Sequence, residues 1–290
     1  MLRPEMVEPR TIEEAVAALK RGRGAMPLAG ATDLIPAIRK GLAKPTALVN
    51  LKRIPDLSGI RRVRNGVSIG AMTTIADLLK DPTLAEGWPL LIEVGRDFGS
   101  PQIRSMATIG GNLCSALPSA DLPPPLLAFD ARVRIAGPKG TREMPLAEFF
   151  MSAGKTALKG GEILTAVILP KPPMRTGAAS EKLTVRQAMD LPIAAAAAAI
   201  TLAPNGKTCR RARIALGAVA PTPMRAMKAE RVLESQAVTP DLIALAAAAA
   251  AAEAKPISDL RASAEYRREM TAVLVRRSLE SAFARAGGGR

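Results

Sequence analysis

Apolar residues recur along the chain in short runs separated by glycine, proline and charged residues. Residues 11–22, TIEEAVAALKRG, have the spacing of an amphipathic helix, with Thr11 as N-cap, Glu14 three residues later and Gly22 at its end. Similar spacing predicts further helices at residues 34–40, 73–80, 88–95, 122–128, 240–254 and 264–286.

Short apolar segments bounded by turn residues predict strands. They lie at residues 26–29, 47–51, 67–69, 133–136 and 143–145, and residues 107–112 are predicted as a strand or a turn. Residues 193–202 contain six consecutive alanines, for which intrinsic propensity favours a helix. We predict a strand instead, paired with residues 210–219, because Pro204-Asn205-Gly206 has the composition of a turn between them.

The region around residues 170–177 is rich in proline and positive charge, which is typical of a linker. We therefore expect one domain over residues 1–175, with subdomains of about 1–55 and 56–175, and a C-terminal domain over residues 176–290. The mixture of helices and hairpins predicts the α+β class, with an antiparallel sheet and helices in the C-terminal domain.

Apolar residues make up 48% of the 290 positions, which is typical of a globular protein. No run of 18 or more apolar residues lacks a polar interruption, so we expect no membrane span. The first residues lack the apolar core of a secretory signal, and we expect a cytoplasmic protein.

Histidine is absent from the sequence, which excludes Ser-His-Asp and Cys-His catalysis and a His-ligated metal. The two cysteines, Cys114 and Cys209, cannot complete a four-cysteine zinc or iron–sulfur site within one chain. We expect no metal and no catalytic side chain here, so demanding chemistry requires a bound cofactor or a partner subunit.

The net charge of +15 raises the alternative of a non-enzymatic basic module that binds nucleic acid. Lys and Arg are spread along the chain, however, and one Trp, one Tyr and five Phe supply few stacking residues. We therefore expect no nucleic-acid partner; a basic surface also attracts an acidic protein or an anionic cofactor.

Two loops place glycine beside hydroxyl and amide or carboxylate groups. They are Ala29-Gly30-Ala31-Thr32-Asp33 and Thr108-Ile109-Gly110-Gly111-Asn112. Glycine lets a ligand approach the backbone, and successive N–H groups form a nest for an anion such as a pyrophosphate. Neither loop matches the Rossmann or P-loop fingerprint, and a tight turn is the alternative explanation for each.

The segments PLAGATDLIPAIRKG and PQIRSMATIGGN resemble the two FAD loops of the medium subunit of molybdenum hydroxylases, the xanthine dehydrogenase and aerobic carbon monoxide dehydrogenase family. GEILTAVILP, EKLTVRQAMDLPIA and RIALGAVAPTPMRAMKAERVL follow in the family's order, and the likeness covers nearly the whole chain. The resemblance implies a FAD-binding domain of the vanillyl-alcohol-oxidase type, with two α/β subdomains, in residues 1–175.

The resemblance also implies which residues bind FAD. They are Ala29, Gly30, Ala31, Thr32, Asp33, Leu34, Phe98, Thr108, Ile109, Gly110, Gly111, Asn112, Asp121, Leu164 and Lys182. The first loop would wrap the diphosphate and adenosine side, and the second would hold the diphosphate and ribityl portion. Lys182 would meet the isoalloxazine edge and stabilise negative charge there.

A structural role without any contact to a cofactor is the alternative for several of these positions. Phe98 and Leu164 could be core residues, Lys182 a solvated lysine, and Asp121 the cap of the helix at 122–128. Cys114 is expected to be a small buried residue rather than a redox group.

The sequence departs from the family in two places. Ala31 stands where many relatives have glycine or asparagine, and residues 178–181 lack the family's usual aromatic residue before the lysine. With two cysteines and no long insertion, the chain does not resemble the 4-hydroxybenzoyl-CoA reductase branch, which carries an iron–sulfur cluster in this subunit.

The function implied by the resemblance is electron transfer. A large partner subunit would carry the molybdenum cofactor and a small one the [2Fe-2S] clusters, in a heterotrimer, and FAD would pass electrons to NAD, a quinone or another acceptor. A free-standing FAD-dependent oxidase is the other enzymatic alternative, but it needs a substrate pocket with a base.

Overall fold

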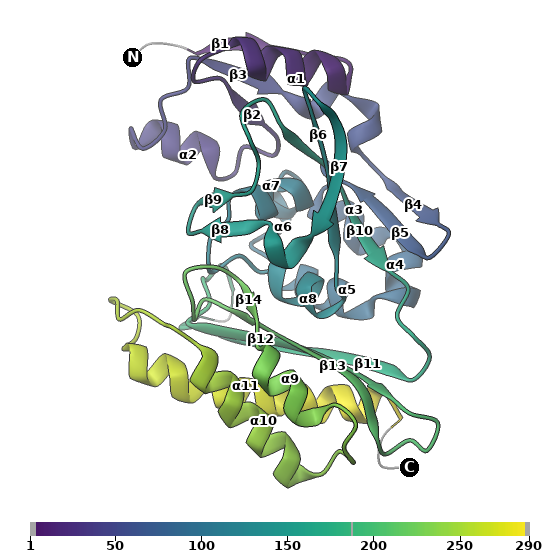
Figure 1. The fold of residues 1–290 in the computed structure, drawn as a ribbon. Coiled ribbons are helices and arrows are strands. Elements are labelled where there is room, and N and C mark those ends of the chain that lie inside the picture. Colours follow the sequence, from purple (N-terminus) through teal and green to yellow (C-terminus); the bar gives the residue numbers. More distant parts are fainter. Residues whose placement is uncertain (1–3, 187, 288–290) are drawn as a thin grey trace.

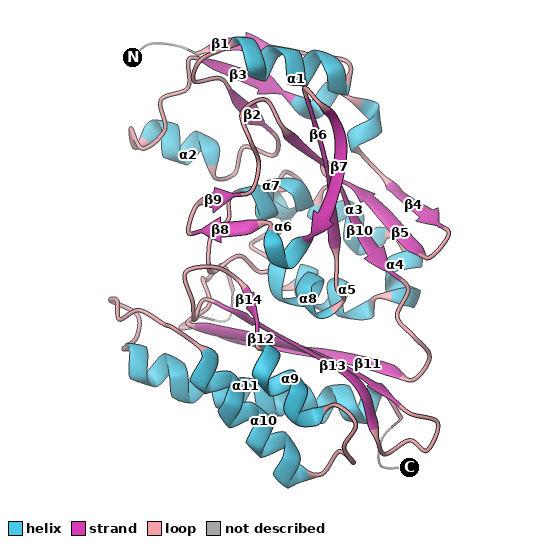
Figure 2. Cartoon of the chain, in the orientation of Figure 1, coloured by secondary structure: helices cyan, strands magenta, loops and turns pink. Residues whose placement is uncertain are grey.

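The computed structural model of the protein describes residues 4–186 and 188–287. The chain forms three stacked layers, each built around a β-sheet, with the N-terminal sheet at one end of the molecule and the C-terminal sheet at the other (Figure 1). Helices lie between and outside the sheets (Figure 2). This arrangement confirms the expected α+β class.

The first layer is a parallel sheet in the order β1-β3-β2. Its strands are β1 Glu5–Val7, β2 Met26–Leu28 and β3 Ala47–Asn50, and its helices are α1 Ile12–Arg21 and α2 Leu34–Arg39. The predicted N-cap of α1 is confirmed, because Thr11 Oγ1 accepts a hydrogen bond from the Glu14 amide. The Glu14 carboxylate accepts a bond from the amide of Arg10, the residue before the N-cap. Short 3-10 helices, η1 Leu51–Arg53 and η2 Pro55–Leu57, lead to the second layer.

The second layer is an antiparallel sheet in the order β4-β5-β10-β6-β7. Its strands are β4 Ile60–Val63, β5 Gly66–Gly70, β6 Arg132–Gly137, β7 Gly140–Pro145 and β10 Ile163–Pro170. The predicted strands at residues 67–69, 133–136 and 143–145 are confirmed, and they lie in the hairpins β4–β5 and β6–β7. A small sheet of β8 Phe150–Ser152 and β9 Lys155–Thr156 follows η3 Leu146–Glu148.

Helices cover one face of this second sheet. They are α3 Ile75–Lys80, α4 Pro82–Gly87, α5 Pro89–Arg96, α6 Pro101–Arg104, α7 Ile109–Cys114 and α8 Pro123–Ala128. Val67, Ile69, Val133, Ile135 and Val167 alternate along their strands and pack into the core beneath the helices. Their polar neighbours consequently lie on the opposite face of the sheet.

The third layer is an antiparallel sheet in the order β11-β12-β13-β14, with helices on both faces. Its elements are β11 Thr176–Leu183, β12 Ala194–Leu202, β13 Cys209–Gly217, β14 Met224–Arg225, α9 Met227–Leu233, α10 Pro240–Glu253 and α11 Ala264–Arg285. The prediction that residues 193–202 and 210–219 pair as strands is confirmed. No helix in the described ranges is both long and apolar enough to cross a membrane.

Small side chains let the helices approach this sheet closely. A methyl carbon placed on Gly177 of β11 would lie 2.1 Å from the carbonyl oxygen of Ala282 of α11. The alanines of β12 face α11 on one side and α8 on the other. The tertiary contact overrides the helix propensity of the alanine run, because a buried central strand needs small residues here.

Ion pairs join the third layer to the second. Asp130, which follows α8, accepts hydrogen bonds from Arg211, from Arg213 Nε at 2.9 Å and from Arg225 Nη1 at 2.6 Å. Arg225 also pairs with Glu230. One carboxylate thus receives three arginines from the C-terminal sheet.

Candidate cofactor site

The two glycine loops lie against each other in the structure. A methyl carbon placed on Gly30 would lie 2.0 Å from the carbonyl oxygen of Met106, just before the second loop. One placed on Gly111 would lie 3.9 Å from the Ala29 side chain. Segments far apart in sequence therefore form one surface, with Ala29 and Gly111 at the contact.

The second loop differs from the prediction in its local structure. Residues 109–114 form helix α7 rather than a strand or turn, and Thr108 is its N-cap, with Oγ1 accepting from the Gly111 amide at 3.0 Å. Gly110 is required by the protein itself, because a methyl carbon there would lie 2.6 Å from the carbonyl oxygen of Ala71. Gly110 therefore serves close packing of α7 on the residues after β5.

The backbone amides of this segment are already used. The amides of Ile109, Gly110 and Asn112 donate to the carbonyl oxygens of Thr73, Ala71 and Thr108, and that of Gly111 to the Thr108 side chain. The prediction of an anion nest in the second loop is therefore wrong in this structure. Apart from the Thr108 amide, any contact of this segment with an anion must come from its side chains.

The backbone amides of the first loop, in contrast, are free. The amides of Ala31, Thr32, Asp33 and Leu34 donate no hydrogen bond to any of the residues that the structure describes. Ala31 has a φ of 66°, in the left-handed region that alanine rarely adopts, so its amide is turned away from the direction of a regular strand. Burial raises the pKa of the Asp33 carboxyl. This loop offers the free donors that a diphosphate requires.

Asn112 supplies a further observation that favours a bound group. Its side-chain oxygen is buried and has no hydrogen-bond partner within the described chain. A buried acceptor without a donor is costly, at about 1–3 kcal/mol. A ligand hydroxyl or amide beside α7 would satisfy this oxygen, so the residues present fit a polar cofactor.

Asp121 and Lys182, expected at the same cofactor, meet in the structure. Lys182 Nζ, on β11, donates to Asp121 Oδ1 at 2.9 Å. Burial raises the pKa of the Asp121 carboxyl, the Lys182 ammonium lowers it, and the nearby Asp97 carboxylate raises it. Lys182 is therefore not simply a solvated lysine, and Asp121 does not cap the following helix, whose N-cap residue is Leu122.

Two apolar positions of the expected site lie in the core. Phe98 follows α5 and Leu164 lies on β10, with 8% and 4% of their surface exposed. Both belong to the cluster beneath the helices of the second layer. They share this cluster with Ile109 of the second segment.

Two other residues bear on the electrostatics of the region. Asp97 was not singled out from the sequence, since nothing local marks it as a neighbour of Asp121. Burial raises the pKa of the Cys114 thiol to about 12, which keeps it protonated at neutral pH and fits a small packed residue.

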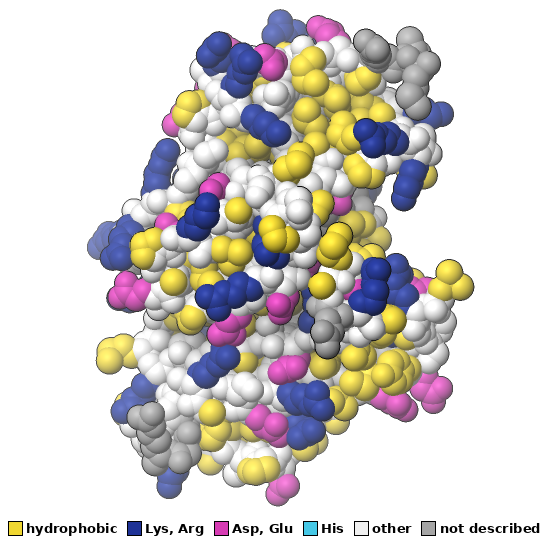
Figure 3. Space-filling view, turned by 180° about the vertical axis from the view of Figure 1, so that it is seen from behind, with side chains coloured by type: hydrophobic (Ala, Val, Ile, Leu, Met, Phe, Trp, Pro, Cys, Tyr) yellow, Lys and Arg dark blue, Asp and Glu magenta, His cyan; other side chains and the backbone are white. Residues whose placement is uncertain are grey.

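Basic side chains do not gather at any single place on the face of the molecule shown in Figure 3. Lys and Arg are spread from one end of the molecule to the other and alternate with acidic and apolar groups. This distribution lacks the continuous basic stripe of a nucleic-acid-binding protein.

Comparison with known proteins identifies the family. Residues 2–172 match the family described as the FAD-binding domain in molybdopterin dehydrogenase, and residues 180–282 match the C-terminal domain of the CO dehydrogenase flavoprotein. The chain belongs to this family. It is an oxidoreductase subunit that contains the FAD-binding domain of molybdenum hydroxylases.

Relatives span the whole chain. The carbon monoxide dehydrogenase medium chain of Afipia carboxidovorans is 42% identical, with 96% of each chain covered. The xanthine dehydrogenase FAD-binding subunit of Escherichia coli is 31% identical, covering 96% of this chain and 95% of that protein. The carbon monoxide dehydrogenase structure from Hydrogenophaga pseudoflava has a TM-score of 0.95 and 37% identity, with 98% of each chain covered. These similarities confirm the expected fold of a flavoprotein medium subunit with its C-terminal domain.

Proposed function

We propose that this chain is the electron-transfer flavoprotein subunit of a multi-subunit molybdenum hydroxylase. The observation that carries the proposal is the contact between the two glycine loops in a chain of the FAD-binding family. We take residues 1–175, with subdomains of about 1–55 and 56–175, as the FAD-binding domain and residues 176–290 as the C-terminal domain.

The first loop is the proposed diphosphate site. Its free amides at residues 31–34 supply donors that need no rearrangement, because no other group of the described chain uses them. Gly30 is needed for the loop to pack on Met106. Thr32 adds a hydroxyl beside these amides.

The second segment contributes side chains rather than amides. Asn112 offers its unpaired buried oxygen, and Thr108, Ile109, Gly110 and Gly111 form the surface on which the ribityl portion would lie. Phe98 and Leu164 would support the site from the core.

Lys182 and Asp121 are the proposed contacts near the flavin ring. The ion pair holds the Lys182 ammonium at a fixed place at the junction of the second and third layers. A positive charge there favours electron-rich forms of a neighbouring group. When bound, FAD supplies the ability to exchange electrons with both two-electron and one-electron partners.

The proposed route uses partner subunits. Relatives are named medium chains or medium subunits, such as that of carbon monoxide dehydrogenase, which fits a complex with a large and a small partner. Electrons would pass from a molybdenum cofactor on the large partner through [2Fe-2S] clusters on the small one to FAD here. They would leave to an external acceptor such as NAD or a quinone.

The test is an absorption spectrum and a measurement of flavin content, made on the chain co-expressed with its neighbouring subunits. We expect an absorption spectrum of oxidised flavin and about one FAD released per chain on heating. The Lys182→Met variant should bind FAD more weakly and shift its reduction potential downwards, because a stabilising positive charge is lost. The control Lys171→Met changes an exposed lysine in the linker and should leave both unchanged. A colourless complex would sink the proposal.

A further inference from the structure

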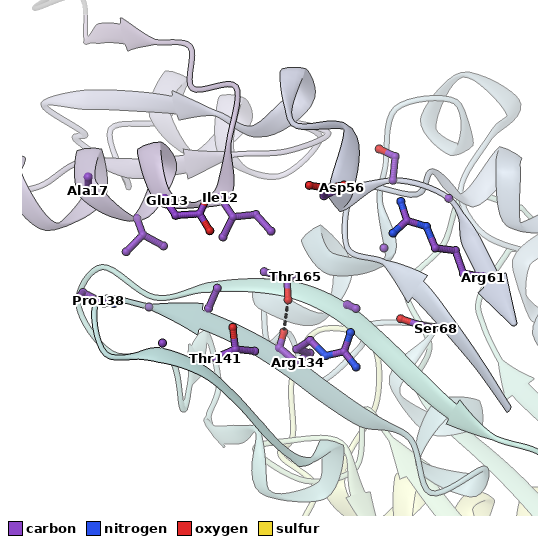
Figure 4. Close-up of a pocket in the computed structure, with 18 of the residues that line it drawn as sticks. Ile12, Glu13, Ala17, Asp56, Arg61, Ser68, Arg134, Pro138, Thr141 and Thr165 are labelled. Atoms are coloured by element: carbon purple, nitrogen blue, oxygen red, sulfur yellow. Dashed lines mark hydrogen bonds between the residues drawn. The ribbon is translucent and has the colours of Figure 1, made fainter. Parts of the chain in front are cut away.

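A cleft of about 670 Å³ lies on the side of the second sheet that faces away from the helices. Its walls are α1 and η2 on one side and the strands of the sheet on the other (Figure 4). Small-molecule sites have volumes of about 300–1,000 Å³, so the cleft has room for a ligand. None of the fifteen residues expected to bind FAD lines it.

The sheet wall carries positive charge because of the strand register. Ser68 lies between Val67 and Ile69, which face the core, so Ser68 faces the cleft. Arg61 of β4 is paired with Ser68 and therefore lies on the same face. Arg134 of β6 also lines the cleft, and Figure 4 shows Arg61 and Arg134 on its sheet side.

Several hydrogen-bond donors on this wall of the cleft are not used by other groups of the described chain. Arg61 forms no ion pair with another described residue, and the hydroxyl groups of Ser58 and Ser68 make no hydrogen bond within the described chain. Arg134 is held by Glu143, which accepts from its Nε at 3.0 Å and its Nη2 at 2.9 Å. The guanidinium of Arg134 is thereby fixed while Nη1 stays available.

The opposite wall has acidic and apolar groups and one basic residue, Lys20 of α1. Glu13 of α1 and Asp56 of η2 line the cleft, and neither forms an ion pair within the described chain. Carboxylates on this wall accept hydrogen bonds from hydroxyl or amino groups. Ile12 and Val16 add an apolar surface beside Glu13.

We propose that this cleft binds a hydroxylated organic phosphate, the chemistry shared by sugar phosphates and nucleotides. The phosphate lies on Arg61 and Arg134 with Ser58 and Ser68, because two guanidinium groups and two hydroxyls match its several acceptor oxygens. The hydroxyl groups of the ligand donate to Glu13 and Asp56. A bare carboxylate would leave most of these donors unmatched.

Calorimetric titration of the purified complex tests this site, with ribose 5-phosphate and AMP as probes and ribose and inorganic phosphate as comparisons. We expect saturable binding of at least one phosphorylated probe, and weaker binding of ribose and of inorganic phosphate. Tighter binding of AMP would identify a nucleotide, through contact of its base with Ile12 and Val16; tighter binding of ribose 5-phosphate would identify a sugar phosphate.

Variants locate the binding in the cleft. Arg61→Gln and Arg134→Gln should each weaken binding by about tenfold or more, because each removes a charged donor from the phosphate. The matched control is Arg62→Gln, one residue along the same strand, whose side chain pairs with Glu86 outside the cleft. Thermal unfolding of each variant confirms that it is folded.

The comparison among variants holds whether or not FAD is bound, since none of the three changes touches a residue of the candidate flavin site. Binding that survives both Arg61→Gln and Arg134→Gln would overturn the proposal. So would the absence of saturable binding, or binding of inorganic phosphate as tight as that of both organic probes.

Discussion

The Asp130→Asn substitution tests what holds the C-terminal sheet against the rest of the chain. The change keeps the shape of the side chain but removes the charge that Arg211, Arg213 and Arg225 share. All three arginines lie on the C-terminal sheet, whereas Asp130 follows α8 of the second layer. The substitution therefore weakens the contact between the second and third layers.

The magnitude follows from how far the groups are buried. Breaking a fully buried ion pair from one side costs about 3–5 kcal/mol, whereas an exposed pair contributes about 0–1 kcal/mol. The side chains of Arg225, Arg213 and Asp130 are 15%, 21% and 27% exposed, between those limits. Glu230 and Glu234 still hold two of the arginines after the change. We expect a loss of about 2 kcal/mol, or a fall in Tm of about 4 °C.

The assay combines thermal unfolding with limited trypsin cleavage of the linker after Arg175, since Pro172 blocks cleavage after Lys171. Looser docking should speed cleavage there before global unfolding. Glu143→Gln is the matched control, because Glu143 also serves two arginines but within one exposed hairpin, where its side chain is 36% exposed. We expect that control to cost under about 1 kcal/mol and to leave linker cleavage unchanged.

Equal effects of the two substitutions on Tm and on cleavage would refute this reasoning. They would mean that the loss of a carboxylate charge, rather than its position at the junction, decides the effect. Asp130→Glu supplies a further check, since it restores the charge and should recover part of the loss.

Two other changes test the first glycine loop and the acid stability of the fold. Gly30→Ala should lower the free energy of unfolding by about 2–3 kcal/mol and reduce FAD content, since its methyl carbon would lie 2.0 Å from the Met106 carbonyl oxygen. Urea unfolding and flavin release measure the two effects. The control is Gly87→Ala, whose methyl carbon would have no atom within 4 Å. Asp259 has its pKa lowered to about 2 by backbone amides and Arg267, so it stabilises the fold above pH 4 and this contribution is lost as pH falls towards 2. Acid unfolding followed by circular dichroism should show a weaker pH dependence in Asp259→Asn over that range, and an unchanged profile would contradict it.

Local signals in the sequence were enough for several helices and strands, but not for short elements such as β1, α4, α6 and α9. Thr11 caps its helix where predicted, because a capping side chain needs only the amide two or three residues away. The alanine run of β12 was predicted as a strand only because a turn and a second apolar segment follow it. Propensity alone would have given a helix.

The candidate site could be predicted as a set of residues but not as an arrangement. From the sequence, Gly110 and Gly111 were expected to form a loop open to a ligand. In the structure their amides donate hydrogen bonds to Ala71 and Thr108 instead. Whether an amide is free depends on which distant carbonyl faces it, and no local pattern contains that information. For the same reason, the sequence could not show that only the first of the two loops keeps its amides free.

The contacts between layers make the geometry of the proposed flavin site depend on both domains. Asp121 lies in the second layer and Lys182 in the third, so their ion pair forms only when the C-terminal sheet is docked. The Asp130 cluster is another contact across this junction, and it holds the strand next to β12, which in turn is paired with β11 and Lys182. A change at Asp130 should therefore weaken FAD binding without touching any residue expected to contact FAD, because it alters where Lys182 is held.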